Sequence, residues 1–364
     1  MSIFSDIYFY VGSKMGGGKM RYLLYGVLSI FLSLIILPSI VIFGFSTHEV
    51  SVDKNLVLVE GGKSVKLDKL PSYEVIRVFI TNQNKIEEMQ LEDYVKGVVA
   101  AEMPAEFEIE ALKAQAVAAR TYALAKELAL GGKGCDLHEG ADVCTDSKHC
   151  QAWQSVEELK GKWGENFEKY YSKISQAVDS TRGLVMVYQD ALILPVYHAI
   201  SGGRTENSED VWQKKIPYLR SVVSPGEEVA SKYKTTVVVS QAEFVKKLKE
   251  RQPSLKLTSN NILSEIKNIE RTQAGHVKTL KIGDVTFEGK EIKELFGLNS
   301  TNFTFSEQKD DIVITVIGYG HGVGMSQYGA NALAKDGKKF DEILKYYYQG
   351  IEIVKIEDLL KGKH

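Results

Sequence analysis

Glu102 stands where a helical pattern breaks, a position that suits a carboxyl group to acid–base chemistry. Apolar residues recur at helical spacing from Leu91 to Val99, and the pattern stops at Met103 and Pro104. Proline disfavours the helical conformation in the residue before it, so we expect the helix to end there. The helix dipole disfavours negative charge at that end, which raises the carboxyl pKa as a general acid at neutral pH requires. The alternative is a surface glutamate at a frayed helix end.

A second helical pattern follows over residues 112–123, and it contains Arg120. A close ion pair between Arg120 and Glu102 would lower the pKa of the carboxyl group and oppose the acid role. We therefore expect Arg120 to position substrate or structure. Three nearby acidic residues are assigned to the first turn of this helix, where the dipole favours them: Glu106, Glu108 and Glu110.

A glycine-rich loop carries all three cysteines of the chain and two histidines. Two thiolates and two imidazoles make a suitable set for tetrahedral zinc, and His138, Cys144, His149 and Cys150 would supply them. Four protein ligands would leave no position for a reacting water, so the ion would be structural. Two alternatives stay open: Cys135 in place of His138, or a Cys144–Cys150 disulfide with Cys135 free.

Two further glycine-rich loops, residues 197–203 and 318–329, each follow a predicted strand. The second has neither the Gly-Lys-Ser/Thr ending of a P-loop nor the acidic residue of a dinucleotide site. Such loops suit a polar, uncharged ligand that is contacted by backbone amides and by Ser326 or Gln327. The alternative is a pair of tight turns with buried glycines and hydrogen-bonded structural histidines.

Residues 22–45 are almost wholly apolar and contain no charged side chain, which is enough to span a bilayer. Basic residues precede this run and acidic residues follow it, so residues 1–21 are predicted to be cytoplasmic and the rest extracytoplasmic. We expect an uncleaved single-pass anchor, with a cleaved signal peptide as the alternative. The formal net charge of −2 and the absence of a basic tract argue against nucleic acid as a partner.

The rest of the chain alternates helical and strand-like segments, which predicts an α+β fold. Residues 46–72 are assigned to a linker, residues 73–354 to a catalytic domain and residues 355–364 to a tail. A composition shift predicts a smaller, β-containing lobe inserted at about 221–299. Within it, Gly283 and Asp284 indicate a hairpin turn, and Gly297 marks the end of a short helix.

Four segments carry a resemblance to a known family. They are LEDYVKGVVAAEMPAEFEIEALKAQAVAARTYAL, ADVCTDSKHCQAW, YHAISGGRTENSEDVW and GYGHGVGMSQYGANALAKDGKKFDEILKYYYQG. Together they resemble the SpoIID/LytB family over most of residues 75–354. The resemblance implies a lytic transglycosylase that acts on peptide-stripped peptidoglycan strands during engulfment in endospore formation. It also implies a glycan groove formed by the main lobe and the inserted lobe.

Carried over by motif, the catalytic acid/base falls on Glu102. The resemblance implies glycan contacts from Arg120, Tyr197, His198, Ser201, Gly202, Gly203, His321, Gly322, Ser326 and Gln327. The metal-bearing branch of the family matches His138, Cys144, His149 and Cys150, which implies structural zinc and no organic cofactor. Implied partners are the glycan strands, a cell-wall amidase and membrane scaffold proteins of the engulfment complex.

Two rival functions remain open from the sequence. One is a zinc amidase that removes the peptide from muramic acid, which would need an open metal site and a general base. The other is a membrane-tethered glycan-binding module that activates an amidase without catalysis of its own.

Overall fold

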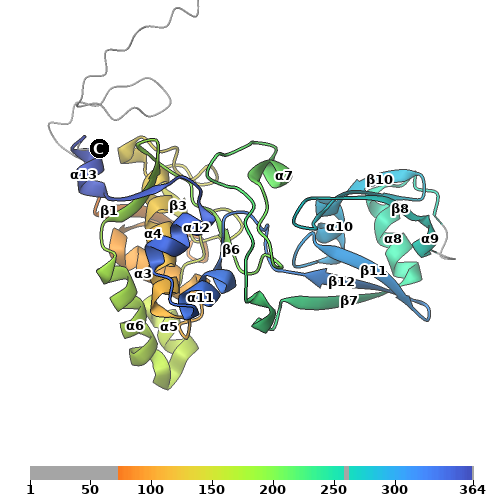
Figure 1. The fold of residues 1–364 in the computed structure, drawn as a ribbon, viewed down its shortest axis with the longest axis horizontal. Helices are drawn as coiled ribbons and strands as arrows, with labels where there is room; N and C mark the ends of the chain where they lie inside the picture. The colour runs from red at the N-terminus through yellow and green to blue at the C-terminus, as the bar shows by residue number, and fades with distance from the viewer. Residues whose placement is uncertain (1–72, 258–261, 363–364) are drawn as a thin grey trace, which may run out of the picture. The chain divides into compact units, whose positions relative to one another are not determined.

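The computed structural model describes residues 73–257 and 262–362, and its elements are labelled in Figure 1. The strands are β1 (Val75–Ile80), β2 (Lys85–Gln90), β3 (Val143–Cys144), β4 (Leu184–Tyr188), β5 (Ala191–Leu192), β6 (Tyr197–His198), β7 (Lys234–Ser240), β8 (Ile266–Arg271), β9 (Val277–Ile282), β10 (Val285–Glu288), β11 (Phe303–Gln308), β12 (Asp311–Ile317), β13 (Met325–Ser326) and β14 (Glu352–Lys355). The α-helices are α3 (Leu91–Glu102), α4 (Ile109–Lys126), α5 (Val156–Trp163), α6 (Phe167–Ser180), α7 (Ser208–Trp212), α8 (Gln241–Arg251), α9 (Ile262–Glu265), α10 (Gly289–Phe296), α11 (Gln327–Lys335), α12 (Phe340–Tyr347) and α13 (Ile356–Leu360), with 3₁₀ turns η1 (Leu128–Leu130), η2 (Gly164–Asn166) and η3 (Glu227–Val229).

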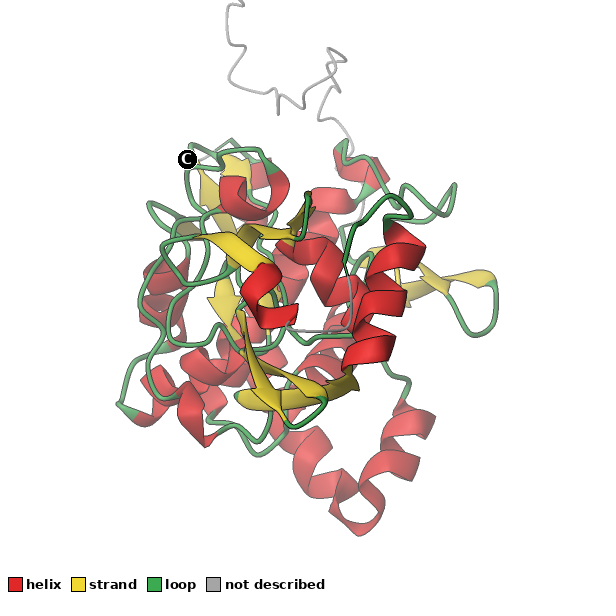
Figure 2. Cartoon of the chain, turned by 90° about the vertical axis from the view of Figure 1, so that its right-hand side faces the viewer, coloured by secondary structure: helices red, strands yellow, loops and turns green. Residues whose placement is uncertain are grey.

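The strands form small sheets of two or three members, with orders β2-β1-β3, β14-β4-β5, β13-β6, β11-β12-β7 and β10-β9-β8. Figure 2 shows these short strands in yellow among red helices and green loops. The predicted mixture of helices and sheets is confirmed.

The helices α3, α4 and α6 pack on one another and form the centre of the larger hydrophobic core. α3 ends at Glu102 because Met103 takes an extended conformation (φ −118°, ψ 144°) directly before Pro104. The helix end predicted from the sequence is therefore confirmed. The side chains of Tyr94 and Val98 are fully buried against the neighbouring helices.

A buried ion pair links these helices. The Arg120 guanidinium, with no exposed surface, donates from Nε and Nη2 to the Glu92 carboxylate at 2.9 and 2.6 Å. It also donates to the carbonyl oxygens of Val178 and Leu184 at 3.3 and 3.2 Å. One arginine thus joins α3, α4, α6 and β4, and bidentate geometry offsets the cost of burying both charges.

Two parallel pairings bring remote loops together. β3 lies beside β1, with Cys144 opposite Phe79, so the cysteine-bearing loop is attached to the first sheet. β13 lies beside β6, with Ser326 opposite His198. The two glycine-rich loops predicted as ligand-binding segments are therefore neighbours.

A second hydrophobic core lies between the β7–β12–β11 and β8–β9–β10 sheets and the helices α8 and α10. The turn from β9 to β10 falls at Gly283 and Asp284, and Gly297 ends α10 with a φ of 63°, as predicted. β11 and β12 lie beyond residue 299 but share a sheet with β7. The predicted domain limits stay a prediction.

The predicted single-pass membrane topology requires a correction. None of the helices within residues 73–257 and 262–362 combines the length and the apolar character needed to cross a bilayer. α4, at 18 residues, carries several charged side chains, among them Lys113 and Arg120. The predicted anchor, residues 22–45, lies outside the described residues, so the structure does not support this topology.

We predict that Arg120→Ala lowers the free energy of unfolding by about 3–5 kcal/mol, because it leaves the Glu92 carboxylate buried without its partner. Arg182→Ala is the matched control, since Arg182 is exposed and lies 3.8 Å from Asp179; its effect should stay below about 1 kcal/mol. Denaturant unfolding followed by circular dichroism measures both. Equal losses in the two variants would contradict the assigned role of the buried pair.

Candidate active site

The Glu102 carboxyl group is held between two N–H donors from remote parts of the chain. The backbone N–H of Ala152 donates to Oε1 at 2.8 Å, and Nε2 of Gln327 donates to Oε2 at 3.2 Å. Burial raises the pKa of Glu102 more than these hydrogen bonds lower it. No charged neighbour contributes to this balance among the described residues. A neutral carboxylic acid that can ionise is therefore available at the end of α3.

Raised carboxyl pKa values also occur elsewhere, but in closed surroundings. Burial is the main cause of a pKa of about 8 for Glu127 and about 7 for Glu206. These two side chains are only 2% and 1% exposed, whereas Glu102 is half-buried and reaches solvent. Of these three arrangements, that of Glu102 offers a proton to a large ligand.

The orientation of the Gln327 amide is set by a second acceptor. Its Nε2 group also donates to Oε1 of Gln115, at 3.5 Å, so the nitrogen rather than the oxygen faces Glu102. Gln327 is the first residue of α11, and Ser326 caps that helix by accepting the N–H of Gly329 at 3.2 Å. The position of the donor thus depends on the start of α11.

The Ala152 N–H, the other donor to Glu102, is held in place by the neighbouring residue Gln151, which is buried. Its Nε2 donates to the Tyr94 hydroxyl at 3.1 Å, and its Oε1 accepts the Tyr197 hydroxyl at 2.8 Å. Burial, followed by the proximity of Glu102, raises the pKa of Tyr197 well above its usual range. Tyr197 is thus a neutral neighbour of Glu102 whose hydroxyl proton is engaged.

The Ser-Gly-Gly loop surrounds an internal carboxylate. Glu227, which has no exposed surface, accepts the backbone N–H groups of Ser201, Gly202 and Gly203 at 3.0, 2.8 and 2.9 Å. Positive φ angles of 86° and 101° at the two glycines turn these N–H groups to the same side. Glycan contacts by this loop would have to use other atoms, and they stay a prediction.

Serine hydroxyls complete the shell of Glu227. Ser201 and Ser224 donate at 2.9 and 2.8 Å, and Ser326 donates from the cap of α11. Glu227 was not predicted from the sequence, since it follows Gly203 by 24 residues and lies outside the family motifs. Gln115, Gln151 and Ala152 were also missed, and their inclusion in those motifs was the only signal.

The two histidines of the glycine-rich loops are neutral. Nδ1 of His198 faces the Val323 carbonyl at 3.1 Å and so carries the proton, while Nδ1 of His321 accepts the Val323 N–H at 3.1 Å. Burial lowers the pKa of each to about 3. Gly322 is packed closely, since an added Cβ would lie 3.1 Å from Cγ of Glu206. His198 Nε2 is buried without a partner in the described structure.

Arg120 takes one of the two roles that the sequence left open. Its complete burial and its pairing with Glu92 assign it to structure, and it contacts neither Glu102 nor solvent. A direct contact with glycan is incompatible with this position, so its place among the substrate-contacting residues is corrected.

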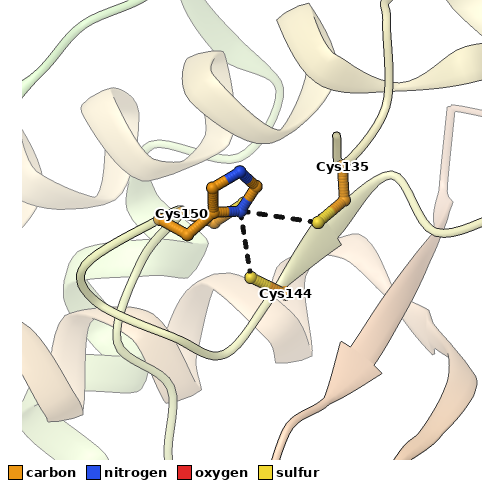
Figure 3. A group of neighbouring side chains, drawn as sticks. Cys135, Cys144 and Cys150 are labelled. Carbon is orange, nitrogen blue, oxygen red and sulfur yellow. Dashed lines mark hydrogen bonds between the residues drawn. The ribbon is translucent and has the colours of Figure 1, made fainter. Parts of the chain in front are cut away.

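Cys135, Cys144, His149 and Cys150 form a compact group in the cysteine-bearing loop (Figure 3). The three sulfur atoms lie 3.5, 3.4 and 3.4 Å from Nδ1 of His149, and all three thiols are free. The disulfide alternative is therefore not formed. The group offers three sulfurs and one nitrogen that could hold a metal ion.

His138 is not part of this group, which corrects the predicted ligand set. Its ring stacks on Phe79, with 3.6 Å between the ring centroids and 10° between the planes. Cys135 takes the position in the group that was predicted for His138. The Cys135 N–H donates to the Ala141 carbonyl, and this hydrogen bond closes the loop.

Comparisons with known proteins identify the family of the chain. A family model described as "SpoIID: Stage II sporulation protein" matches residues 80–188, which contain Glu102 and the cysteine group. The chain belongs to the SpoIID family. It is 42% identical over 285 residues to the stage II sporulation protein D of Bacillus subtilis, covering 78% of this chain and 80% of the relative.

Two further relatives extend the comparison. The stage II sporulation protein D of Bacillus amyloliquefaciens is 38% identical over 78% of this chain and 80% of its own length. A Bacillus subtilis protein named "Amidase enhancer" is 31% identical over 70% of this chain, but only 39% of that protein is covered.

We predict that Gln327→Met raises the pKa of Glu102 further, because it removes a donor that favours the ionised carboxylate. Carbon-13 NMR titration of the glutamate carboxyl signals measures this shift, with Glu102→Gln identifying the resonance. Gln349→Met is the control, since among the described residues that exposed amide donates to the Tyr346 carbonyl alone. An unchanged Glu102 titration in Gln327→Met would contradict the contact.

Proposed function

We propose that the protein is a peptidoglycan lytic transglycosylase. It would cleave the bond between N-acetylmuramic acid and N-acetylglucosamine in peptide-stripped strands, with a 1,6-anhydro product, during engulfment in endospore formation. Membership of the SpoIID family supports a role in sporulation. The observation that carries the enzymatic part is the half-buried Glu102, whose pKa is raised and which has no cationic partner in the described residues.

In the proposed reaction, Glu102 first acts as an acid. Its carboxyl proton passes to the bridging oxygen while the glycosidic bond breaks and an oxocarbenium-like transition state forms. The ionised Glu102 then removes the proton of the sugar's own C6 hydroxyl, whose oxygen attacks C1 and closes the anhydro ring. The N–H groups of Ala152 and Gln327 stabilise the carboxylate between these two steps.

A single carboxylate suffices for this route. Ordinary glycosidases use a second one as nucleophile or base. In this reaction the nucleophile belongs to the substrate, and intramolecular attack reaches effective molarities of about 10⁵ M in well-oriented cases. The hydrogen-bond network of Glu102 accordingly contains amides and a backbone N–H but no second acid in the described chain.

We predict that Glu102→Gln keeps the fold and lowers release of anhydro-ended products by at least about 100-fold, because an amide cannot donate and recover the proton. Incubation with peptide-stripped glycan, followed by mass spectrometry, identifies the ends. Glu108→Gln is the matched control, as this exposed residue makes no side-chain cap at the start of α4. If Glu102→Gln releases anhydro-ended products at the parental rate, the assignment of Glu102 as the catalytic acid and base is wrong.

The proposal includes a structural zinc ion at Cys135, Cys144, His149 and Cys150. Tetrahedral zinc, with bonds of about 2.3 Å to sulfur and 2.0–2.1 Å to nitrogen, separates a sulfur ligand from a nitrogen ligand by about 3.5 Å. The observed sulfur–nitrogen distances of 3.4–3.5 Å fit that geometry. Four protein ligands would make the ion structural rather than catalytic. One of these ligands, Cys150, comes two residues before Ala152, whose N–H donates to Glu102.

We predict about one zinc ion per chain after purification in reducing, chelator-free buffer, measured by plasma mass spectrometry. Cys135→Ser should lose zinc, whereas His138→Ala should retain it, because the His138 ring stacks on Phe79 instead of joining the group. The reverse pattern would restore His138 as the ligand. Absence of zinc from the parent chain would remove the ion from the proposal.

The second candidate is a glycan-binding activator of a cell-wall amidase without catalysis of its own. The similarity to the protein named "Amidase enhancer" favours it. An amidase partner is also compatible with the first proposal, since such an enzyme would supply peptide-stripped strands. A zinc amidase is disfavoured, because a site closed by four protein ligands has no position for a reacting water.

A further inference from the structure

We propose that Glu227 is a positioning residue for the chemistry of Glu102. Its buried carboxylate would hold Ser326, and through Ser326 the first turn of α11, so that the Gln327 amide reaches the Glu102 carboxyl group. The expected effect of Glu227 on turnover rests on the proposed function. The expected effect of Glu227 on the titration of Glu102 does not.

The surroundings of Glu227 are built to hold a charge without a cation. Six groups donate to it: the backbone N–H groups of Ser201, Gly202 and Gly203 and the hydroxyls of Ser201, Ser224 and Ser326. An isolated carboxylate is unfavourable in a buried environment, and such a shell of donors offsets the cost of its burial. Each donor is fixed in return, so segments from three parts of the chain meet at one anchor.

The connection to Glu102 runs through one serine and its neighbour. The Ser326 hydroxyl has a single proton and two acceptors within reach, the Glu227 carboxylate and, farther away at 3.3 Å, the Ala199 carbonyl. It donates to the nearer Glu227, and its oxygen accepts the Gly329 N–H as the cap of α11. Gln327 follows directly and donates to Glu102 at 3.2 Å. A shift of the cap therefore moves the donor of the catalytic carboxyl group.

Charge removal at Glu227 would disturb this chain of contacts. In Glu227→Gln, the new NH₂ group faces hydroxyl and N–H donors, and at least one of them loses its acceptor. We expect turnover of peptide-stripped glycan to fall by about 10- to 100-fold with little change in KM, as displacement of a catalytic contact by about 1 Å has that effect. Glu227→Asp keeps the charge on a shorter side chain and should restore part of the loss.

The titration of Glu102 provides a readout that a purely structural role would not move. Loss of the Gln327 contact in Glu227→Gln should raise the pKa of Glu102, in the direction expected for Gln327→Met. The other titratable groups that face Glu102 are Tyr94 and Tyr197, and burial raises the pKa of both. They stay neutral through the range in which the carboxyl group titrates.

The experiment is a double-mutant cycle in the full chain, with Glu227→Gln, Gln327→Met and the combined variant, followed by NMR titration of Glu102 and by kcat on peptide-stripped glycan. Glu228→Gln is the matched control, because that neighbouring carboxylate is exposed. If Glu227 acts through Gln327, the second substitution adds little to the first in either readout.

Two results would overturn the inference: an unchanged Glu102 titration in folded Glu227→Gln, or effects of the two substitutions that simply add. Failure of the proposed function looks different. In that case the parent chain releases no anhydro-ended products, while the titration half of the cycle still decides the role of Glu227.

Discussion

Two N–H groups hold the Glu102 carboxyl group, and they come from segments 50 and 225 residues away along the chain. This convergence requires the segment that carries Ala152 and the start of α11 to meet at the end of α3. The Ala152 donor depends on the loop that ends at the cysteine group, and the Gln327 donor depends on the cap of α11. The burial of Gln151 and Gln115 beside them keeps both segments in place.

Three carboxylates in this core are stabilised in different ways. Glu92 faces a buried guanidinium, which suits a permanent charge that joins elements. Glu227 faces six neutral donors and needs no cation. Glu102 has only two donors among the described residues and is half-buried. Burial raises its pKa above the ordinary value of a glutamate, so its neutral form persists to a higher pH than that of a free glutamate side chain. That intermediate environment suits the proposed role, in which Glu102 both gives and takes a proton.

The cysteine group and the Glu227 shell each include a residue that comes just before one of the two donors of Glu102 in the sequence. Cys150 precedes the Gln151–Ala152 segment, and Ser326 precedes Gln327. Neither cluster supplies a hydrogen bond to Glu102 itself in the described part of the chain. In the proposed function, both clusters limit the conformational freedom of the two donors and so prepare the site before substrate binds.

Local features of the chain could be predicted because their causes are local. The helix end at Glu102 follows from Pro104, the hairpin from Gly283 and Asp284, and the end of α10 from Gly297. The ligand set of the cysteine group was only partly predictable, since five residues of suitable chemistry occur in one loop and spacing does not choose among them. The stacking of His138 on Phe79, which lies on β1, decided the matter.

The hydrogen-bond partners of the glycine-rich loops could be identified only from the tertiary structure. Their composition indicated exposed backbone donors, but not that an internal carboxylate occupies them. The burial of Arg120 against Glu92 was equally invisible, because both residues read as polar positions on helices. The sequence by itself determined where helices and turns begin and end, since backbone sterics act over a few residues. Only the tertiary structure decided which polar groups meet, because such contacts join residues that are far apart in the chain.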